Sequence, residues 1–393
     1  MLTMKGLKYI SWNDTSGYAV ASHRYIRGLI EQDIPLTWTP MIPGSSWGSA
    51  FGYEPFTGTR TGRQEFDPVC NKSMAYDTVL IHLVPEYFPR WIAQEPGKRH
   101  IGYTTWETDK IPDHWPEILN RLDRVWVPST WNKEVFEGSG VTVPIDVIPH
   151  ILAPAPGPDA RVAHPLMSQV PPENYVFYSV NVWSRRKALW LLLEAYWSAF
   201  QAHEPVSLVL KTSRNDGTSR YGNKRFPLSG LARTSRTYRK LEKRYPHKPS
   251  TILIAEENTP QPMIDMLHHR CDCYVSLSRA EGWGLGAFDA VAAGNPVIMT
   301  GYGGQTDFLP KEHAGLVDYN LIPVADAMNK KSYSPDQRWG DPDIQQAGQL
   351  MRSAFENPAA ARANGQHLLD DASDHFNQQS VIQKILEILN DRG

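Results

Sequence analysis

The sequence is poor in cysteine. Only Cys70, Cys271 and Cys273 occur among its 393 residues, too few for the disulfide framework that stabilises many small secreted proteins. Cys271 and Cys273 stand two positions apart in an apolar segment, which is strand spacing, and we predict buried thiols rather than metal ligands. The fold must therefore depend on a hydrophobic core.

The sequence also lacks long apolar runs and an excess of charge of one sign. No run approaches the roughly 18 residues of a transmembrane helix, and the N-terminal MLTMKGLKYISW has no signal-peptide pattern. We therefore expect a cytoplasmic protein. With 40 Lys and Arg against 42 Asp and Glu, the net charge is −2, which gives the whole chain no preference for nucleic acid or membranes.

Strand-like apolar segments alternate with helix-like segments through both halves of the chain. Such alternation predicts parallel, doubly wound sheets, and 393 residues exceed one ordinary core. We therefore predict an α/β protein with two facing Rossmann-like domains and a ligand cleft between them. The predicted strands are 7–12, 35–41, 78–83, 99–108, 124–129, 145–150, 175–181, 206–212, 251–257, 273–278, 295–300 and 315–319.

A proline-rich segment separates the two halves. Six prolines without periodicity lie between Ala153 and Asn174, as is typical of a linker. The predicted domains are residues 1–153, the linker 154–174 and the second domain 175–374. A C-terminal helix, 375–393, has an apolar face at helical spacing and is a candidate to cross back to the first domain.

The most informative stretch is EGWGLGAFDAVAAGNPVIMTGYGGQTDFL, from Glu281 to Leu309. An apolar strand enters a glycine-rich turn that opens a helix of small residues, a geometry that suits a phosphate. Glu281 and Asp289 flank this turn. Since carboxylates do not bind phosphate, we expect them to bind sugar hydroxyls; the alternative is an ordinary turn with two surface acids.

Basic residues follow other strands of the second half. Arg186 and Lys187 come just after its first strand and Lys211 ends its second, on the edge where the glycine turn lies. Together they suit a diphosphate, although each taken alone is equally a solvated surface cation. In the first half, Ser16 and Gly17 form a second strand-to-helix turn.

Two further polar residues and two segments of unusual composition are candidates for function. Glu107 and His150 follow strands of the first half, where each is either a ligand group or a helix cap. Residues 41–76 are irregular and aromatic, a candidate carbohydrate platform with Trp47, Phe51 and Tyr53. Residues 211–248 hold twelve Lys and Arg against two acids, either a solvated face or a contact for lipid, a phosphorylated acceptor or nucleic acid.

The order of these motifs resembles the retaining glycosyltransferases of family 4, which have the GT-B fold. The resemblance rests on EGWGLGAFDAVAAGNPVI with GYGGQTDFL, on SGYAVASHRYIRGL, on GYTTWET, IPDHW and VWVPSTWNKEVFEGSGV, on SRRKALWLLLEAY and on RWGDPDIQQAGQLM. It implies a hexosyltransferase that needs no cofactor or metal and uses a UDP- or GDP-sugar as donor. An acceptor glycan or lipid-linked saccharide is expected.

The resemblance also implies residue roles. It puts Glu281 on the donor sugar and Lys187 on the phosphate; Glu107, predicted from its place after a strand, completes the catalytic set. It also assigns the donor phosphates to Ser16, Gly17, Lys187, Gly284, Leu285 and Gly286 and the ribose to Asp289. Arg186 and Lys211, predicted from their places at the strand ends, complete the donor-binding set. Two positions depart from the family pattern. Asp289 replaces the usual Glu, and Asn181 stands where the family has an arginine, whose charge Arg185, Arg186 or Lys211 must supply.

Alternative functions remain open at this stage. A nucleotide-sugar epimerase or a phosphorylase-like enzyme shares the fold, and nucleic acid or protein are other acceptors. A non-catalytic module would use the basic segment to bind nucleic acid or the surface of a membrane. Neither the donor base and sugar nor the oligomeric state follows from the residues.

Overall fold

The protein is described by a computed structural model, in which residues 4–45, 52–154, 164–218, 233–257, 259–326 and 332–391 are described. The chain forms two compact units. Unit 1 comprises Met1–Trp106, Lys110–Leu152 and Asp374–Gly393, and unit 2 comprises Glu107–Asp109 and Ala153–Ser373.

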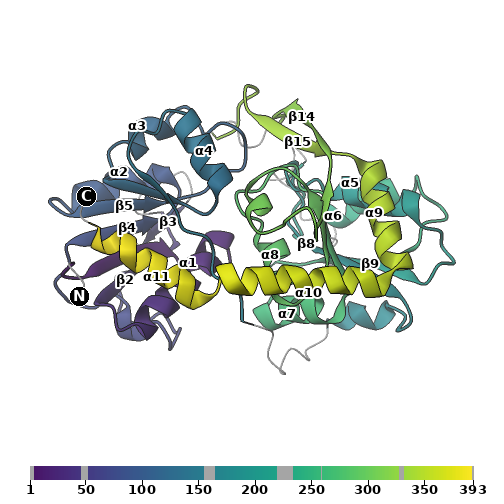
Figure 1. The fold of residues 1–393 in the computed structure, drawn as a ribbon, viewed down its shortest axis with the longest axis horizontal. Helices are drawn as coiled ribbons and strands as arrows, with labels where there is room; N and C mark the ends of the chain where they lie inside the picture. Colours follow the sequence, from purple (N-terminus) through teal and green to yellow (C-terminus); the bar gives the residue numbers. More distant parts are fainter. Residues whose placement is uncertain are drawn as a thin grey trace. The chain divides into compact units, whose positions relative to one another are not determined.

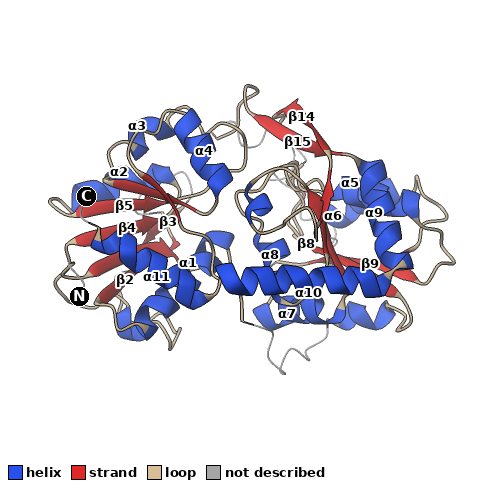
Figure 2. Ribbon diagram, viewed as in Figure 1, coloured by secondary structure: helices blue, strands red, loops and turns tan. Residues whose placement is uncertain are grey.

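Unit 1 is built on a seven-stranded sheet in the order β3-β2-β1-β4-β5-β6-β7 (Figure 2). Its strands are parallel except for β3, which pairs antiparallel with β2 at the edge. The strands are β1 Leu7–Trp12, β2 Leu36–Pro43, β3 Tyr53–Pro55, β4 Thr78–His82, β5 Arg99–Tyr103, β6 Arg124–Val127 and β7 Ile145–Val147. The helices are α1 Gly17–Glu31, α2 Phe88–Gln94, α3 Trp115–Leu119, α4 Thr130–Gly138 and α11 Gln378–Asn390.

Unit 2 has a six-stranded parallel sheet in the order β10-β9-β8-β11-β12-β13 and a separate antiparallel ribbon, β14 with β15. The strands are β8 Tyr175–Val180, β9 Val206–Thr212, β10 Ser250–Ala255, β11 Cys273–Ser276, β12 Val297–Thr300, β13 Gly315–Val317, β14 Tyr319–Pro323 and β15 Arg338–Pro342. The helices are α5 Leu189–Ala199, α6 Arg233–Glu242, α7 Gln261–Arg270, α8 Leu285–Ala292, α9 Ile344–Glu356 and α10 Pro358–His375.

The predicted α/β class is confirmed, and each predicted strand corresponds to a strand of one of the two large sheets. The ribbon and the edge strand β3 were not predicted. β3 and a short 3-10 turn, Asp67–Val69, lie within the stretch predicted as irregular, 41–76. There Tyr53 stacks on Trp12 of β1, with ring centroids 5.1 Å apart, while Trp47 and Phe51 lie outside the described residues.

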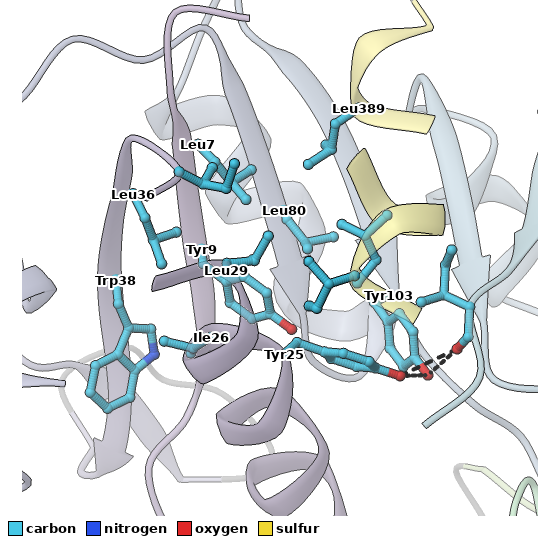
Figure 3. Packing of buried hydrophobic residues seen from close by; sticks show 14 of the residues in the cluster. Leu7, Tyr9, Tyr25, Ile26, Leu29, Leu36, Trp38, Leu80, Tyr103 and Leu389 are labelled. Carbon is cyan, nitrogen blue, oxygen red and sulfur yellow. Dashed lines mark hydrogen bonds between the residues drawn. The ribbon is translucent and has the colours of Figure 1, made fainter. Parts of the chain in front are cut away.

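The core of unit 1 joins the sheet to helices from both ends of the chain. Figure 3 shows Leu29 of α1 and Leu389 of α11 in the same cluster as Tyr9 of β1. In Figure 1 the yellow α11 lies beside the purple α1. The two helices approach closely at Gly28, where a Cβ atom would lie 2.6 Å from Cγ1 of Ile382. The apolar face seen in the C-terminal sequence is thus buried within unit 1.

His150 belongs to this core. It is 6% exposed, and its Nδ1 lies 3.2 Å from the Tyr25 hydroxyl. Burial, with a smaller effect of Arg24, lowers the pKa of His150 to about 3. Its burial beside Tyr25 places His150 in the core, a position that neither of the two alternatives, ligand group or helix cap, anticipated.

In unit 2, α5 packs on the sheet and against α9. Leu192, Leu193 and Tyr196 of α5 are fully buried, as is typical of a helix whose sequence is apolar nearly all round. In the described part of the chain, no helix combines the length and the apolar character needed to span a membrane.

Candidate functional site

Four of the predicted residues come from three adjacent strands of unit 2. β9, β8 and β11 are neighbours and parallel. Arg186 and Lys187 follow β8, Lys211 lies near the end of β9, and Glu281 follows β11. Because parallel strands end at the same edge of a sheet, the four residues share the edge where ligands of open α/β sheets bind.

Glu281 is buried between two cations. Its side chain is 7% exposed; Oε1 contacts Nζ of Lys187, and Oε2 lies 3.1 Å from Nη1 of Arg186. The same Nη1 also donates to the Ala280 carbonyl oxygen at 2.8 Å. A carboxylate buried this deeply is stable only when paired and hydrogen-bonded, and both conditions are met.

The charged cluster continues through Glu107. Its Oε1 lies 3.3 Å from Nη2 of Arg186, and its Oε2 accepts a hydrogen bond from the Tyr333 hydroxyl at 3.2 Å. Glu107 belongs to the short segment 107–109 that groups with unit 2. We call Glu107, Arg186, Glu281, Lys187 and Tyr333 the Glu281 cluster; its acids and bases alternate and their charges balance.

The cluster holds Glu281 and Arg186 in their charged forms. Burial raises the pKa of Glu281, but Lys187 and Arg186 outweigh it and keep that pKa below its ordinary value. Burial lowers the pKa of Arg186, yet Glu107 and Glu281 reverse the effect and raise it. For Lys187, burial wins: its pKa is lowered, although Glu281 opposes the shift. Lys187 is thus the group whose charge depends most on its partner.

The glycine turn directly follows Glu281. Gly284 has φ +94°, in the left-handed region, and precedes the first residue of α8, Leu285. At Gly286 a Cβ atom would lie 2.6 Å from the Tyr274 hydroxyl, so only glycine fits without displacement. The first N–H groups of a helix have no intrahelical acceptor, and here they belong to this turn.

A second glycine supports the backbone of Glu281 itself. A Cβ atom at Gly303 would lie 2.4 Å from the Glu281 carbonyl oxygen. That oxygen accepts a hydrogen bond from the Gly304 N–H at 2.9 Å. The motif GYGGQTDFL therefore fixes the position of Glu281 from the opposite side of the turn.

Strained backbone marks the other half of the cluster. Ala188, next to Lys187, has φ +44° although it is not glycine, and it immediately precedes α5. The Ser184 hydroxyl accepts from the Lys187 N–H at 3.2 Å. Such conformations cost of order 1 kcal/mol or more and collect at functional sites. Sequence analysis did not identify Ala188, because nothing in its residue type signals the conformation.

The remaining donor-binding candidates are placed as follows. Ser16 is the N-cap of α1, where its hydroxyl accepts from the Ala19 N–H at 3.3 Å, and Gly17 is the first helical residue. Asp289 lies in the second turn of α8 and is partly exposed. These roles remain predictions.

Lys211 and Asn181 are separate from the Glu281 cluster by the described contacts. Burial lowers the pKa of Lys211, and Glu257 is its main opposing charge. Asn181, where the family pattern has arginine, donates its amide to the hydroxyls of Ser179 and Ser276 at 3.1 and 3.2 Å. Which of Arg185, Arg186 and Lys211 takes the place of that arginine stays a prediction.

Sequence analysis also missed Tyr333. It lies between β14 and β15, a ribbon that no apolar alternation announced. A tyrosine in a polar loop gives no signal of its own; only its contact with Glu107 assigns it to the cluster.

Part of the sequence matches a known protein family, and the structure is similar to solved ones. Residues 233–385, which include Glu281, the glycine turn and Asp289, match the family described as "Family 4 Glycosyltransferase in conflict systems". The whole structure is similar to HepE of Anabaena in complex with UDP-glucose, with a TM-score of 0.67, 13% identity, and coverage of 98% of this chain and 99% of that one. The chain is a glycosyltransferase with the GT-B fold.

Other solved structures share the GT-B fold of this chain. Sucrose-phosphate synthase of Thermosynechococcus elongatus has a TM-score of 0.67 at 14% identity, covering 98% of both chains. A glycosyltransferase of Rickettsia africae has a TM-score of 0.69 at 13% identity, covering 99% of this chain and 98% of that one. Identities this low establish the shared fold. No curated protein matches this glycosyltransferase by sequence.

Proposed function

We propose that this glycosyltransferase moves a hexose-type sugar from a nucleotide-sugar to an acceptor hydroxyl, with retention of configuration and without a metal. The observation that carries the proposal is the buried Glu281, paired with Lys187 and Arg186 directly before the glycine turn of α8. This arrangement places a carboxylate that can accept hydrogen bonds from hydroxyls, two cations and a helix N-terminus at one edge of the sheet.

Although Glu281 is paired with two cations, its carboxylate can still accept hydrogen bonds from a bound nucleotide-sugar. A carboxylate has about four acceptor positions and an ammonium has three donors, so Glu281 can accept from sugar hydroxyls while Lys187 binds an oxygen of the diphosphate. HepE was solved with UDP-glucose, which favours a UDP-sugar for this chain over a GDP-sugar. Asp289, in the second turn of α8, is the group we assign to the ribose hydroxyls.

The chemistry follows from where charge develops. As the bond between the anomeric carbon and the phosphate oxygen breaks, negative charge grows on the diphosphate. Lys187, Arg186 and the N-terminus of α8 stabilise that charge from fixed positions. The acceptor hydroxyl attacks on the face that the phosphate leaves, and its proton passes to the departing phosphate oxygen. Retention then needs no protein nucleophile.

A panel of UDP- and GDP-sugars tests the proposal. Thermal-shift measurements should give the largest stabilisation with one UDP-sugar, because a ligand stabilises only the folded state that binds it. Release of the nucleotide should then proceed equally with magnesium and with a chelator. Strict dependence on magnesium, or conversion of the donor to an isomeric nucleotide-sugar, would contradict it.

The acceptor is proposed to be a glycan or a lipid-linked saccharide. Glycan arrays and extracted lipid-linked saccharides, incubated with the donor found in the panel, test this part separately. Transfer to neither class, with donor release intact, would contradict the acceptor class and leave the donor chemistry standing.

A further inference from the structure

A stripe of five cations runs along α6 and the turn that follows it. Arg236, Arg239, Lys240, Lys243 and Arg244 are all exposed. The spacing of Arg236, Arg239 and Lys240 places these three on one face of α6, and Lys243 and Arg244 lie in the turn directly after its last residue, Glu242. We call these five residues the α6 stripe.

The opposite face of α6 is apolar and already buried. Tyr238 is 8% exposed and packs against Trp197 of α5 with ring centroids 5.8 Å apart. Tyr245 contacts the same indole at 5.1 Å, and Leu241 packs on the same core. The helix is therefore held by unit 2 through one face and presents the α6 stripe with the other.

Four of the five cations are poorly neutralised by their surroundings. Arg244 lies 4.0 Å from Glu194 at 70% side-chain exposure, a weak surface pair. Within the described residues, Arg239, Lys240 and Lys243 have no carboxylate partner. Residues 211–248 hold twelve cations and two acids, so the rest of the chain holds 28 cations and 40 acids. The charge is segregated rather than balanced locally.

Such a stripe is costly for a helix that serves only as structure. Like charges three and four positions apart repel one another, and the α6 stripe contains such pairs along its whole length. An anion laid across the face would remove this repulsion. The helix rises about 1.5 Å per residue, so the stripe spans roughly 12 Å, a length over which duplex DNA presents several phosphates.

We propose that the α6 stripe is a docking surface for the phosphate backbone of a nucleic acid. A membrane is the less suitable partner, because helices that lie in a membrane surface insert an apolar face, and that of α6 is buried against Trp197. Arginine and lysine contact phosphates without reading bases, so the contact is independent of sequence. It rests on the charge distribution and not on the sugar-transfer chemistry.

Binding of a short fluorescent duplex of arbitrary sequence tests the proposal. We expect anisotropy titrations of the full-length protein to give a strong salt dependence between about 50 and 200 mM, with a logarithmic slope near −0.9 per phosphate contacted. In the variant Arg239→Gln/Lys240→Gln/Lys243→Gln, the slope should become less negative by about 2 to 3 units. The affinity for the duplex should fall at least about tenfold.

A control variant tests whether binding depends on the α6 stripe or only on the net charge of the protein. Lys72→Gln/Arg121→Gln/Lys384→Gln removes three exposed cations from unit 1, and it should bind the duplex within about twofold of wild type if specific contacts decide. An equal loss in both variants would overturn the proposal. So would binding of wild type to phosphatidylglycerol vesicles but not to the duplex.

Two further measurements test whether a loss of binding in the stripe variant comes only from misfolding or from damage to the donor site. The stripe variant should melt close to the wild-type temperature, because the relief of repulsion between neighbouring cations offsets the lost interaction of Arg239 and Lys240 with the C-terminal end of the helix dipole. It should also release nucleotide from the donor at the wild-type rate. A stripe variant that melts at wild-type temperature and still binds the duplex like wild type would refute the assignment directly.

Discussion

At the residue scale, the charged groups around Glu281 shift one another's pKa. Glu281 lies between Lys187 and Arg186, and Glu107 holds Arg186 from its other side. Breaking a buried ion pair by deleting one partner costs about 3 to 5 kcal/mol, because the other charge is left buried alone. Substitutions that keep shape and hydrogen bonding are therefore the informative ones.

Replacement of Glu281 by glutamine should reduce turnover far more than nucleotide binding. The amide retains size but loses the charge and the acceptor strength proposed for the sugar hydroxyls, so we expect about a 100-fold or larger fall in kcat. The Kd for the free nucleotide should change by less than about tenfold, roughly 1.4 kcal/mol. Equal losses in kcat and nucleotide affinity would contradict the role, and Glu312→Gln, on the exposed surface, is the control.

The same variant has a pH signature. Glu281 raises the pKa of Lys187 against the lowering effect of burial. Without that carboxylate, Lys187 loses its proton at lower pH, so nucleotide binding should weaken at a lower alkaline pH than in wild type. An alkaline limb that does not move would show that Lys187 does not bind the nucleotide.

Tyr333 is predicted to act through Glu107. Its hydroxyl donates to the carboxylate that holds Arg186, and hydrogen bonds to charged groups contribute about 1.5 to 3 kcal/mol. Tyr333→Phe should therefore lower kcat/KM by about tenfold or more. In a double-mutant cycle with Glu107→Gln the two losses should not add; full additivity would separate Tyr333 from the cluster.

At the scale of elements, α11, which begins at Gln378, completes a core whose first residue is Met4. Ile382 meets α1 at Gly28, and Ile385 is 1% exposed. A glycine on α1 lets the two helix backbones approach closely, as packing of this kind requires. The last helix is thus part of the fold of unit 1.

Ile385→Ala should therefore destabilise unit 1. Removing a buried isoleucine side chain down to Cβ costs about 2 to 5 kcal/mol. Hydrogen exchange of β1 and β4 amides should show this loss, whereas Lys384→Ala, at the neighbouring exposed position, should leave exchange unchanged within about 0.5 kcal/mol. Unchanged protection in Ile385→Ala would mean that α11 does not support the sheet.

At the scale of the whole molecule, buried histidines make stability depend on pH. Burial lowers the pKa of His23 and of His150 to about 3, and places that of His82 well below its ordinary value. Unfolded histidine titrates near 6.5. Between these values the unfolded chain binds more protons, so stability falls as pH falls from about 6.5 towards 3.

Each such histidine contributes up to about 1.4 kcal/mol per pH unit in this window. In His150→Gln one titration is removed, so the drop in Tm between pH 7 and pH 5 should be smaller than in wild type, even if the variant is less stable at pH 7. His203→Gln, at an exposed position, should keep the wild-type drop. Parallel Tm curves for all three proteins would contradict the prediction.

Local pattern was sufficient for much of the architecture. Alternation of apolar segments predicted the strands of both large sheets, and β1 was predicted residue for residue as Leu7–Trp12. It failed at β3, whose three residues are all partly exposed, at β14, which is largely exposed, and at β15, whose buried residues include only one large apolar side chain, Trp339. Such strands depend on neighbours distant in sequence, so they carry little apolar periodicity of their own.

The sequence by itself determined that Glu281, the glycine turn, Arg186 and Lys187 share one sheet edge, because parallel strands that alternate with helices end on the same side. Only the tertiary structure decided that Arg186 lies between two carboxylates, that Tyr333 joins them, and that Ala188 adopts a left-handed backbone. The first two features depend on side chains from distant segments: Glu107 lies 79 residues before Arg186 and 226 residues before Tyr333. Residue type and spacing encode strands and helices, but contacts of that range exist only once the chain has packed.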